Sequence, residues 1–233
     1  MASRQISFEW PHSVSMRRNN FAVNPSNQTA LQWIESWPHW GSYASVIYGP
    51  KGSGKTHLAH IWAEKSQGVF LDSKLAEADF MAVAQKFKCL VIDDADQFTN
   101  QQLLFHTLNS AKNNNGSLLL LARSATPQWK VTLPDLSSRL NALPQIAIAT
   151  PDQEMLAILM TKQFADRQMA VDPGVIDYAV VRLNRSYAAI QAFVDMADQF
   201  SLEMKRRVTV SLARDIVQEL DRHFAVPDVP DKA

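Results

Sequence analysis

The segment from Gly49 to Thr56 constrains this chain more than any other, because it fits the phosphate-binding P-loop pattern G-x-x-x-x-G-K-[ST] at every fixed position. Glycines let the backbone turn tightly, so that successive N–H groups face phosphate oxygens, and a following helix adds its own free N–H groups and dipole. The apolar run 44–48 predicts a strand before the loop, and the pattern at 56–64 predicts a helix after it. A chance glycine-rich turn is the alternative. The residues expected to contact a nucleotide here are Gly49, Pro50, Lys51, Gly52, Ser53, Gly54, Lys55, Thr56 and His57.

Four side chains have distinct expected roles at this site. Lys55 supplies a mobile cation for the β- and γ-phosphates, and Thr56 supplies a hydroxyl to Mg²⁺, which prefers oxygen ligands and keeps several waters. The apolar run 89–92 ends in Asp93 and Asp94. Asp93 is expected to hold Mg²⁺ through its water shell, and Asp94 to orient or deprotonate the attacking water. The alternative is that these two aspartates cap a helix after the strand. The ligands expected at the site are ADP or ATP together with Mg²⁺.

Short apolar runs alternate with helical patterns between residues 44 and 149. The expected strands at 44–48, 69–71, 89–92, 118–121 and 146–148 lack polar alternation, as strands covered on both faces do. This predicts an α/β fold with a five-stranded parallel sheet. A helix is expected after the capping sequence at Thr99, and after Thr150 four helical patterns follow without strands. They predict a small all-α domain.

Length and composition bound the organisation and exclude some function classes. The 233 residues fit a core domain with a smaller appendage, which we place at 21–150 and 151–224, after an N-terminal arm at 1–20 and before a disordered tail at 225–233. The 23 basic and 23 acidic residues balance, so no net charge draws the chain onto nucleic acid or anionic lipid. The single Cys89 cannot form an internal disulfide. With no apolar run long enough to span a bilayer, a cytoplasmic location without membrane contact is expected.

Together, the P-loop, the Asp93-Asp94 pair, the strand leading to Ser124 and the helical C-terminal part resemble the AAA+ superfamily, and within it the DnaA-related proteins, especially their short Hda branch. The resemblance runs from residue 5 to about residue 222. It implies a three-layer AAA+ base domain followed by a helical lid, with catalytic roles for Asp94, Ser124 and Arg139. Arg139, in the segment 134–140, would be an arginine finger; a surface salt bridge is the alternative.

Two N-terminal segments extend this resemblance. The segment 21–27 is similar to the one that wraps the adenine, which makes Phe21, Val23 and Asn27 the expected base neighbours; core packing of the arm is the alternative. The segment 5–11 resembles a peptide motif that binds the replicative sliding clamp. Its alternation suits docking of an extended chain, and equally a strand packed on the chain's own core. The expected clamp-binding residues are Gln5, Ile6, Ser7, Phe8 and Trp10.

One position departs from the family pattern. Where DnaA-related proteins carry a phosphate-contacting arginine in the third lid helix, this chain has Ala188, and Arg185 three residues earlier is the candidate substitute. A solvated arginine, or one in the N-terminal turn of the helix, is the alternative for Arg185. The departure puts ATP sensing by this chain in doubt more than it does nucleotide binding.

The resemblance implies negative regulation of DNA replication initiation. A nucleotide-bound form, with ADP as the expected ligand, would bind the sliding clamp (the β subunit of DNA polymerase III) and stimulate hydrolysis of DnaA-bound ATP through Arg139 acting in trans. Balanced charge and the short C-terminal end predict no sequence-specific DNA binding. A self-standing ATPase, such as a helicase loader, is the alternative, and homo-oligomerisation stays open.

Overall fold

The sheet at the centre of the larger domain is parallel throughout, with strand order β2-β3-β4-β1-β5 among the residues 16–204 and 207–224 that the computed structural model describes. This confirms the predicted five-stranded parallel α/β sheet. The motif at 5–10 and the tail at 225–233 lie outside the described residues. The strands are β1 (Ala44–Tyr48), β2 (Val69–Phe70), β3 (Cys89–Ile92), β4 (Ser117–Ala122) and β5 (Gln145–Ala147).

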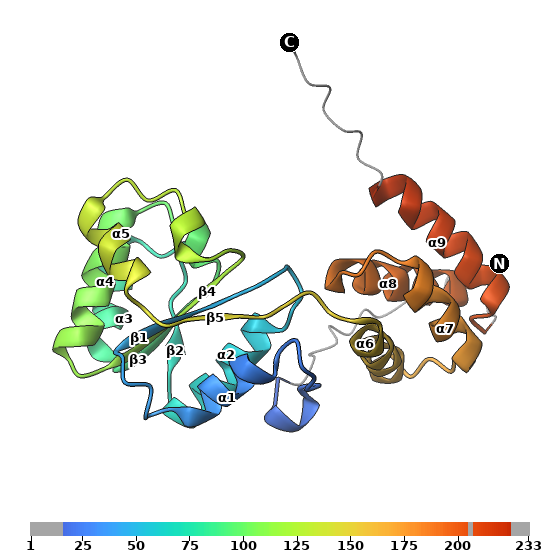
Figure 1. Ribbon diagram of the computed structural model, residues 1–233, viewed down its shortest axis with the longest axis horizontal. Coiled ribbons are helices and arrows are strands. Elements are labelled where there is room, and N and C mark those ends of the chain that lie inside the picture. Colours follow the sequence, from blue (N-terminus) through green and yellow to red (C-terminus); the bar gives the residue numbers. More distant parts are fainter. Residues whose placement is uncertain (1–15, 205–206, 225–233) are drawn as a thin grey trace, which may run out of the picture.

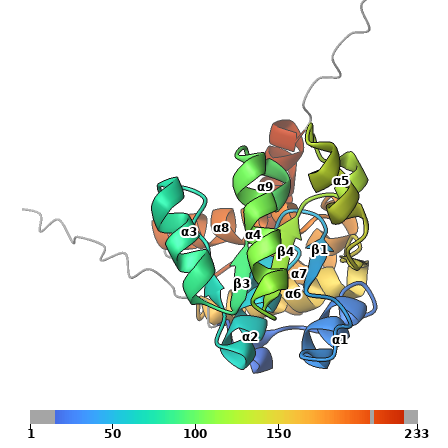
Figure 2. The same ribbon diagram turned by 90° about the vertical axis from the view of Figure 1, so that its left-hand side faces the viewer.

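Helices cover both faces of this sheet, which explains why its strands are apolar without alternation (Figures 1 and 2). Along β4, Leu118 and Leu120 pack with α3, α4 and α5, whereas Leu119 and Leu121 pack with α1 and α2 on the opposite face. The result is a three-layer domain with two cores. The helices are α1 (Gln28–Ser36), α2 (Lys55–Ser66), α3 (Glu77–Lys86), α4 (Gln101–Asn113) and α5 (Pro134–Asn141).

A separate bundle of helices forms the lid, beside the carboxyl ends of the strands (Figure 1). Its buried side chains, Phe164 and Phe193 among them, form a core of their own. The chain passes from β5 into this bundle through residues 148–152. The lid helices are α6 (Gln153–Asp166), α7 (Pro173–Arg182), α8 (Tyr187–Met204) and α9 (Val210–Phe224). No helix in the described part of the chain is both long and apolar enough to cross a membrane.

Two helices begin slightly later than the capping sequences predict. The Asn100 side chain accepts a hydrogen bond from the Leu103 amide at 3.0 Å, and Asp152 accepts one from the Met155 amide at 2.8 Å. The N-caps are therefore Asn100 and Asp152 instead of the threonines at 99 and 150. Asn and Asp rank above Thr as N-cap residues, which explains the difference.

Candidate nucleotide site

The P-loop connects the end of β1 to the first turn of α2. Gly52 and Gly54 have φ angles of 80° and 89°, in the left-handed region that glycine adopts without steric cost. The Gly49 amide donates to the Ala122 carbonyl at 3.1 Å, which ties the start of the loop to the end of β4. The loop therefore leaves the carboxyl edge of the sheet, where ligands bind in open α/β folds.

Lys55 is the first residue of α2, and its ammonium group is held inside the loop. It donates to the Gly49 and Pro50 carbonyls, both at 2.8 Å. Burial lowers the pKa of Lys55, while the neighbouring carboxylates of Asp93 and Asp94 act in the opposite direction. The P-loop lysine thus lies close to both aspartates.

Thr56 and Asp93 meet at the position expected for a magnesium ion. The Thr56 hydroxyl donates to Asp93 Oδ2 at 2.8 Å, and Asp93 Oδ1 accepts from the Asp94 amide at 2.9 Å. The described residues contain no group of three or more His, Cys, Asp or Glu side chains that could hold a metal. One hydroxyl and one carboxylate suit Mg²⁺ bound with phosphate oxygens and water, because this ion is seldom held by an all-protein cage.

Asp94 has a different partner, which the sequence patterns did not indicate. Its backbone is left-handed, with φ 48°, and its carboxylate lies 3.5 Å from Nε of Arg123, with both side chains about half exposed. With its amide turned so that the oxygen faces Arg123, Gln97 accepts from the same nitrogen at 3.0 Å. Arg123 directly follows β4, which lies between β3 and β1, so only the strand order places it between Asp94 and the P-loop. Ser124, the predicted catalytic residue, accepts a hydrogen bond from the Trp129 indole through its carbonyl at 2.8 Å.

A cavity of about 540 Å³ opens between the P-loop, the N-terminal segment and the lid. This volume lies within the ordinary range for small-molecule sites, so a nucleotide fits the space and the residues around it. Gly49, Pro50 and Lys51 lie outside the lining, as does Val23, whose side chain is 42% exposed. The predicted nucleotide-binding residues that line it are Gly52, Ser53, Gly54, Lys55, Thr56, His57, Phe21 and Asn27.

Phe21 covers the P-loop from the N-terminal side. A Cβ atom placed on Gly54 would lie 3.0 Å from the Phe21 ring, and the edge of that ring packs on His57 with centroids 5.2 Å apart. His57 Nε2 lies 3.0 Å from the Arg17 carbonyl, and burial lowers the His57 pKa. The neutral ring with hydrogen on Nε2 satisfies both observations.

Asn27 is buried and holds the turn that follows Phe21. Its side chain donates to the Ala22 carbonyl at 2.8 Å and accepts from the Asn24 amide at 3.0 Å. Both ends of the amide are therefore used within the segment, so Asn27 shapes this wall of the cavity.

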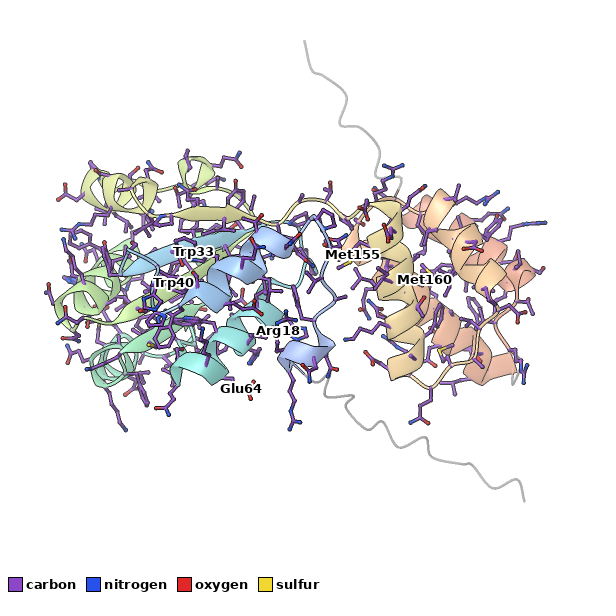
Figure 3. All side chains as sticks on the ribbon, turned by 60° about the horizontal axis from the view of Figure 1, so that its bottom comes forward. Arg18, Trp33, Trp40, Glu64, Met155 and Met160 are labelled. Atoms are coloured by element: carbon purple, nitrogen blue, oxygen red, sulfur yellow. The ribbon has the colours of Figure 1, made fainter. Side chains whose placement is uncertain are left out.

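The lid completes the cavity with residues that carry no recognisable motif. Met155 faces the sheet domain, whereas Met160, one and a half turns along α6, points into the lid core (Figure 3). Arg167 reaches the lining but is paired with Asp195 at 2.5 Å. Arg185 is exposed and outside the lining. The lid residues that line the cavity are Met155, Leu159, Lys162, Gln163, Asp166, Arg167, Tyr187 and Gln191.

Arg139 lies on α5, away from this cavity. Its guanidinium donates to Asn109 Oδ1 at 2.7 Å and lies 4.9 Å from the centre of the Phe105 ring. Both partners belong to α4, so the side chain is partly buried and held by a neighbouring helix. It does not line its own chain's P-loop cavity.

Comparison with known proteins supports the fold more strongly than any activity. No family model matches the chain. An uncharacterized protein of Haemophilus influenzae is 26% identical over 188 residues, which cover 73% of this chain and 80% of that protein.

Solved structures place the fold more exactly. Domain III of the replication initiation protein DnaA from Thermotoga maritima has a TM-score of 0.77 at 19% identity, covering 90% of this chain and 98% of that one. AMPPCP-bound DnaA from Aquifex aeolicus has a TM-score of 0.69 at 18% identity, covering 88% of this chain and 69% of that one. A RuvB mutant from Thermotoga maritima has a TM-score of 0.63 at 15% identity, covering 84% of this chain and 69% of that one. The chain therefore has an AAA+ fold. More closely, it is the fold of DnaA domain III.

Proposed function

We propose that this chain is a nucleotide-holding regulator of the initiator DnaA. In this proposal, ADP or ATP with Mg²⁺ occupies the P-loop cavity, and Arg139 enters the nucleotide site of a neighbouring DnaA molecule to stimulate hydrolysis there. The observation that carries the proposal is the position of Arg139, which is anchored on α4 outside its own cavity. Because Arg139 lies outside its own chain's cavity, it is better placed to contact a nucleotide bound to a neighbouring protein.

Three further features support the proposal. The chain has the fold of DnaA domain III over 90% of its length, so it can present the same kind of surface to DnaA that a second DnaA domain would. The stacking of Arg139 on Phe105 limits its rotamers, which reduces the entropy lost when it binds a phosphate group. The Thr56–Asp93 pair and the Lys55 position are what a bound Mg²⁺–nucleotide needs.

The decisive experiment is single-turnover hydrolysis of DnaA-bound ATP, with sliding clamp loaded on DNA. We expect Arg139→Ala to lose most of the stimulation, because an arginine finger supplied in trans accelerates GTPases by roughly 10³–10⁵. Arg182→Ala is a matched control, since Arg182 also stacks on an aromatic ring, that of Tyr178 at 3.9 Å, but belongs to the lid. Equal stimulation by the Arg139→Ala and unmodified proteins would remove the finger from this account.

The clamp is proposed as the second partner through the N-terminal residues Gln5 to Trp10. A pull-down with clamp compares Gln5→Ala and Phe8→Ala with the unmodified chain, and both variants should lose binding because an extended peptide depends on a few side-chain pockets. Full binding by both would mean that this motif is not the contact.

A self-standing ATPase remains the second candidate, favoured by the Thr56–Asp93 contact that prepares a magnesium site. In this candidate function, ATP is hydrolysed in the chain's own P-loop cavity instead of in a neighbouring DnaA molecule. Sustained turnover of ATP by the purified chain without DnaA would favour it, whereas co-purified ADP with negligible turnover favours the regulator.

A further inference from the structure

Tyr187, the first residue of α8, lies directly against the P-loop. A Cβ atom placed on Gly52 would come within 2.9 Å of the Tyr187 Cβ, a distance that real Cβ atoms essentially never reach. Gly52 thus has two reasons to be glycine, its φ of 80° and this contact. The lid therefore rests on the loop expected to hold the phosphates.

Tyr187 is buried, but it belongs to no domain core. Its side chain is 5% exposed, and it is absent from the lid cluster built around Phe164 and Phe193 as well as from both clusters of the sheet domain. Its hydroxyl approaches Ser26 without the geometry of a hydrogen bond, and the Ser26 hydroxyl itself donates to Asn24 at 2.7 Å. Burial raises the Tyr187 pKa. The side chain thus fills the junction between lid, P-loop and N-terminal segment.

Two hydrogen bonds also join the N-terminal segment to the connecting segment and to the start of the lid. Asn24 Nδ2 reaches Asp152 at 3.4 Å, and the Ala149 amide donates to the Ser26 carbonyl at 3.0 Å, within the connecting segment. Neither hydrogen bond involves the P-loop, whereas the Tyr187 Cβ packs directly on Gly52.

We infer that Tyr187 is a positioning residue that couples the nucleotide in the P-loop to the orientation of the lid. Interiors are close-packed, so a sub-ångström change of the loop cannot be absorbed at Gly52 and must move α8. The Tyr187 Cβ lies against Gly52 and the ring fills the junction beyond it, so the coupling would act through packing. The inference rests on the proposed nucleotide binding and deepens it, since it names the residue through which a bound nucleotide would act on the lid.

Amide hydrogen exchange with and without ADP and Mg²⁺ tests this coupling. In the unmodified protein, ADP should slow exchange in α2 and also in α6 and α8. Tyr187→Ala keeps the Cβ contact with Gly52 but removes the ring that fills the junction. In this variant the slowing in α2 should persist, while the slowing in α6 and α8 should fall at least about 5-fold, the lower end of typical coupling between sites. Tyr187→Phe should behave as the unmodified protein, because it keeps the ring.

Tyr178→Ala is the matched control, as Tyr178 is a half-buried lid tyrosine stacked under Arg182 and outside the cavity. Because Tyr187 lies outside the lid core, circular dichroism should find the Tyr187→Ala lid still helical. Unchanged lid protection in Tyr187→Ala, or loss in Tyr187→Phe equal to that in Tyr187→Ala, would overturn the inference. Protection of α2 without lid protection in the unmodified protein would overturn it too, while leaving nucleotide binding intact. Absence of protection in α2 as well would refute nucleotide binding itself.

Discussion

The sheet domain gives the cavity polar groups fixed by backbone geometry, whereas the lid gives it three apolar or aromatic side chains (Met155, Leu159 and Tyr187) beside five polar or charged ones. Lys55, Thr56 and Asp93 are held by hydrogen bonds of 2.8 Å at the carboxyl edge of the sheet. Across the cavity, Met155 and Tyr187 are buried without belonging to the lid core. Under the proposed function, the sheet domain would provide the nucleotide affinity, and the lid would respond to the bound nucleotide.

The largest expected effect tests whether the lid folds on its own core. Phe193 is fully buried and meets Phe164 edge to face at 6.4 Å, so Phe193→Ala should cost about 3–5 kcal/mol of unfolding free energy. Urea denaturation measures this cost, and Leu202→Ala, at a side chain 72% exposed in the same helix, should change it by less than about 0.5 kcal/mol. A loss in the sheet domain equal to that in the lid would contradict the separation of the two cores.

The next effect concerns the polar half of the cavity. Lys55→Ala should weaken ADP binding roughly 10- to 150-fold, since charge-assisted hydrogen bonds contribute about 1.5–3 kcal/mol. Isothermal titration calorimetry measures the affinity, with Lys112→Ala, a lysine stacked on Tyr43 at the other end of the sheet, as control. Equal losses in the two variants would mean that general charge, and not the loop, governs binding.

A smaller effect is expected at the pair formed by Asp94 and Arg123. Both side chains are about half exposed, so a double-mutant cycle with Asp94→Asn and Arg123→Ala should give a coupling under about 1 kcal/mol. Chemical denaturation provides the four unfolding free energies. A coupling of several kcal/mol would show that Asp94 is locked and is not available to orient water.

The smallest effect is a pH dependence at the boundary between the two regions. The His57 pKa is lowered chiefly by burial, and to a lesser degree by the charge of Lys162 on the lid. The unfolded chain therefore binds this proton more readily, so stability should be highest above the ordinary histidine pKa of about 6.5 and fall as the pH drops below it. The measurement is the unfolding free energy at roughly half-unit steps from about pH 7.5 to about pH 5. Its dependence on pH should be shallower in His57→Gln than in the unmodified protein. His39→Gln, at a histidine with an exposed side chain, is the control and should leave the slope unchanged.

Much of the fold follows from local patterns. The strands at 44–48 and 89–92 match the predicted ranges, because a continuous apolar run bounded by polar residues has one stable arrangement in a parallel sheet. The capping residues differ by one or two positions, since Thr99 and Asn100 both satisfy the local pattern. The P-loop and Asp93 were predictable because their chemistry depends on short-range spacing.

Other parts of the site depend on long-range placement. Arg123 and Gln97 meet Asp94 only because β4 lies between β3 and β1, an order that no local pattern encodes. The lid residues around the cavity, Tyr187 among them, lie far from the P-loop in sequence. Their contact arises from the direction in which the connecting segment leaves β5.

The sequence by itself determined that this chain has a phosphate-binding loop, a following carboxylate pair and a parallel α/β sheet with a helical appendage, because each depends on residues within one strand, turn or helix. The tertiary structure alone decided which residues meet at and beside the P-loop: Thr56 on Asp93, Arg123 beside Asp94, Phe21 over Gly54 and Tyr187 over Gly52. The physical reason is that these contacts follow from strand order and from the packing of separate cores, which are properties of the whole chain.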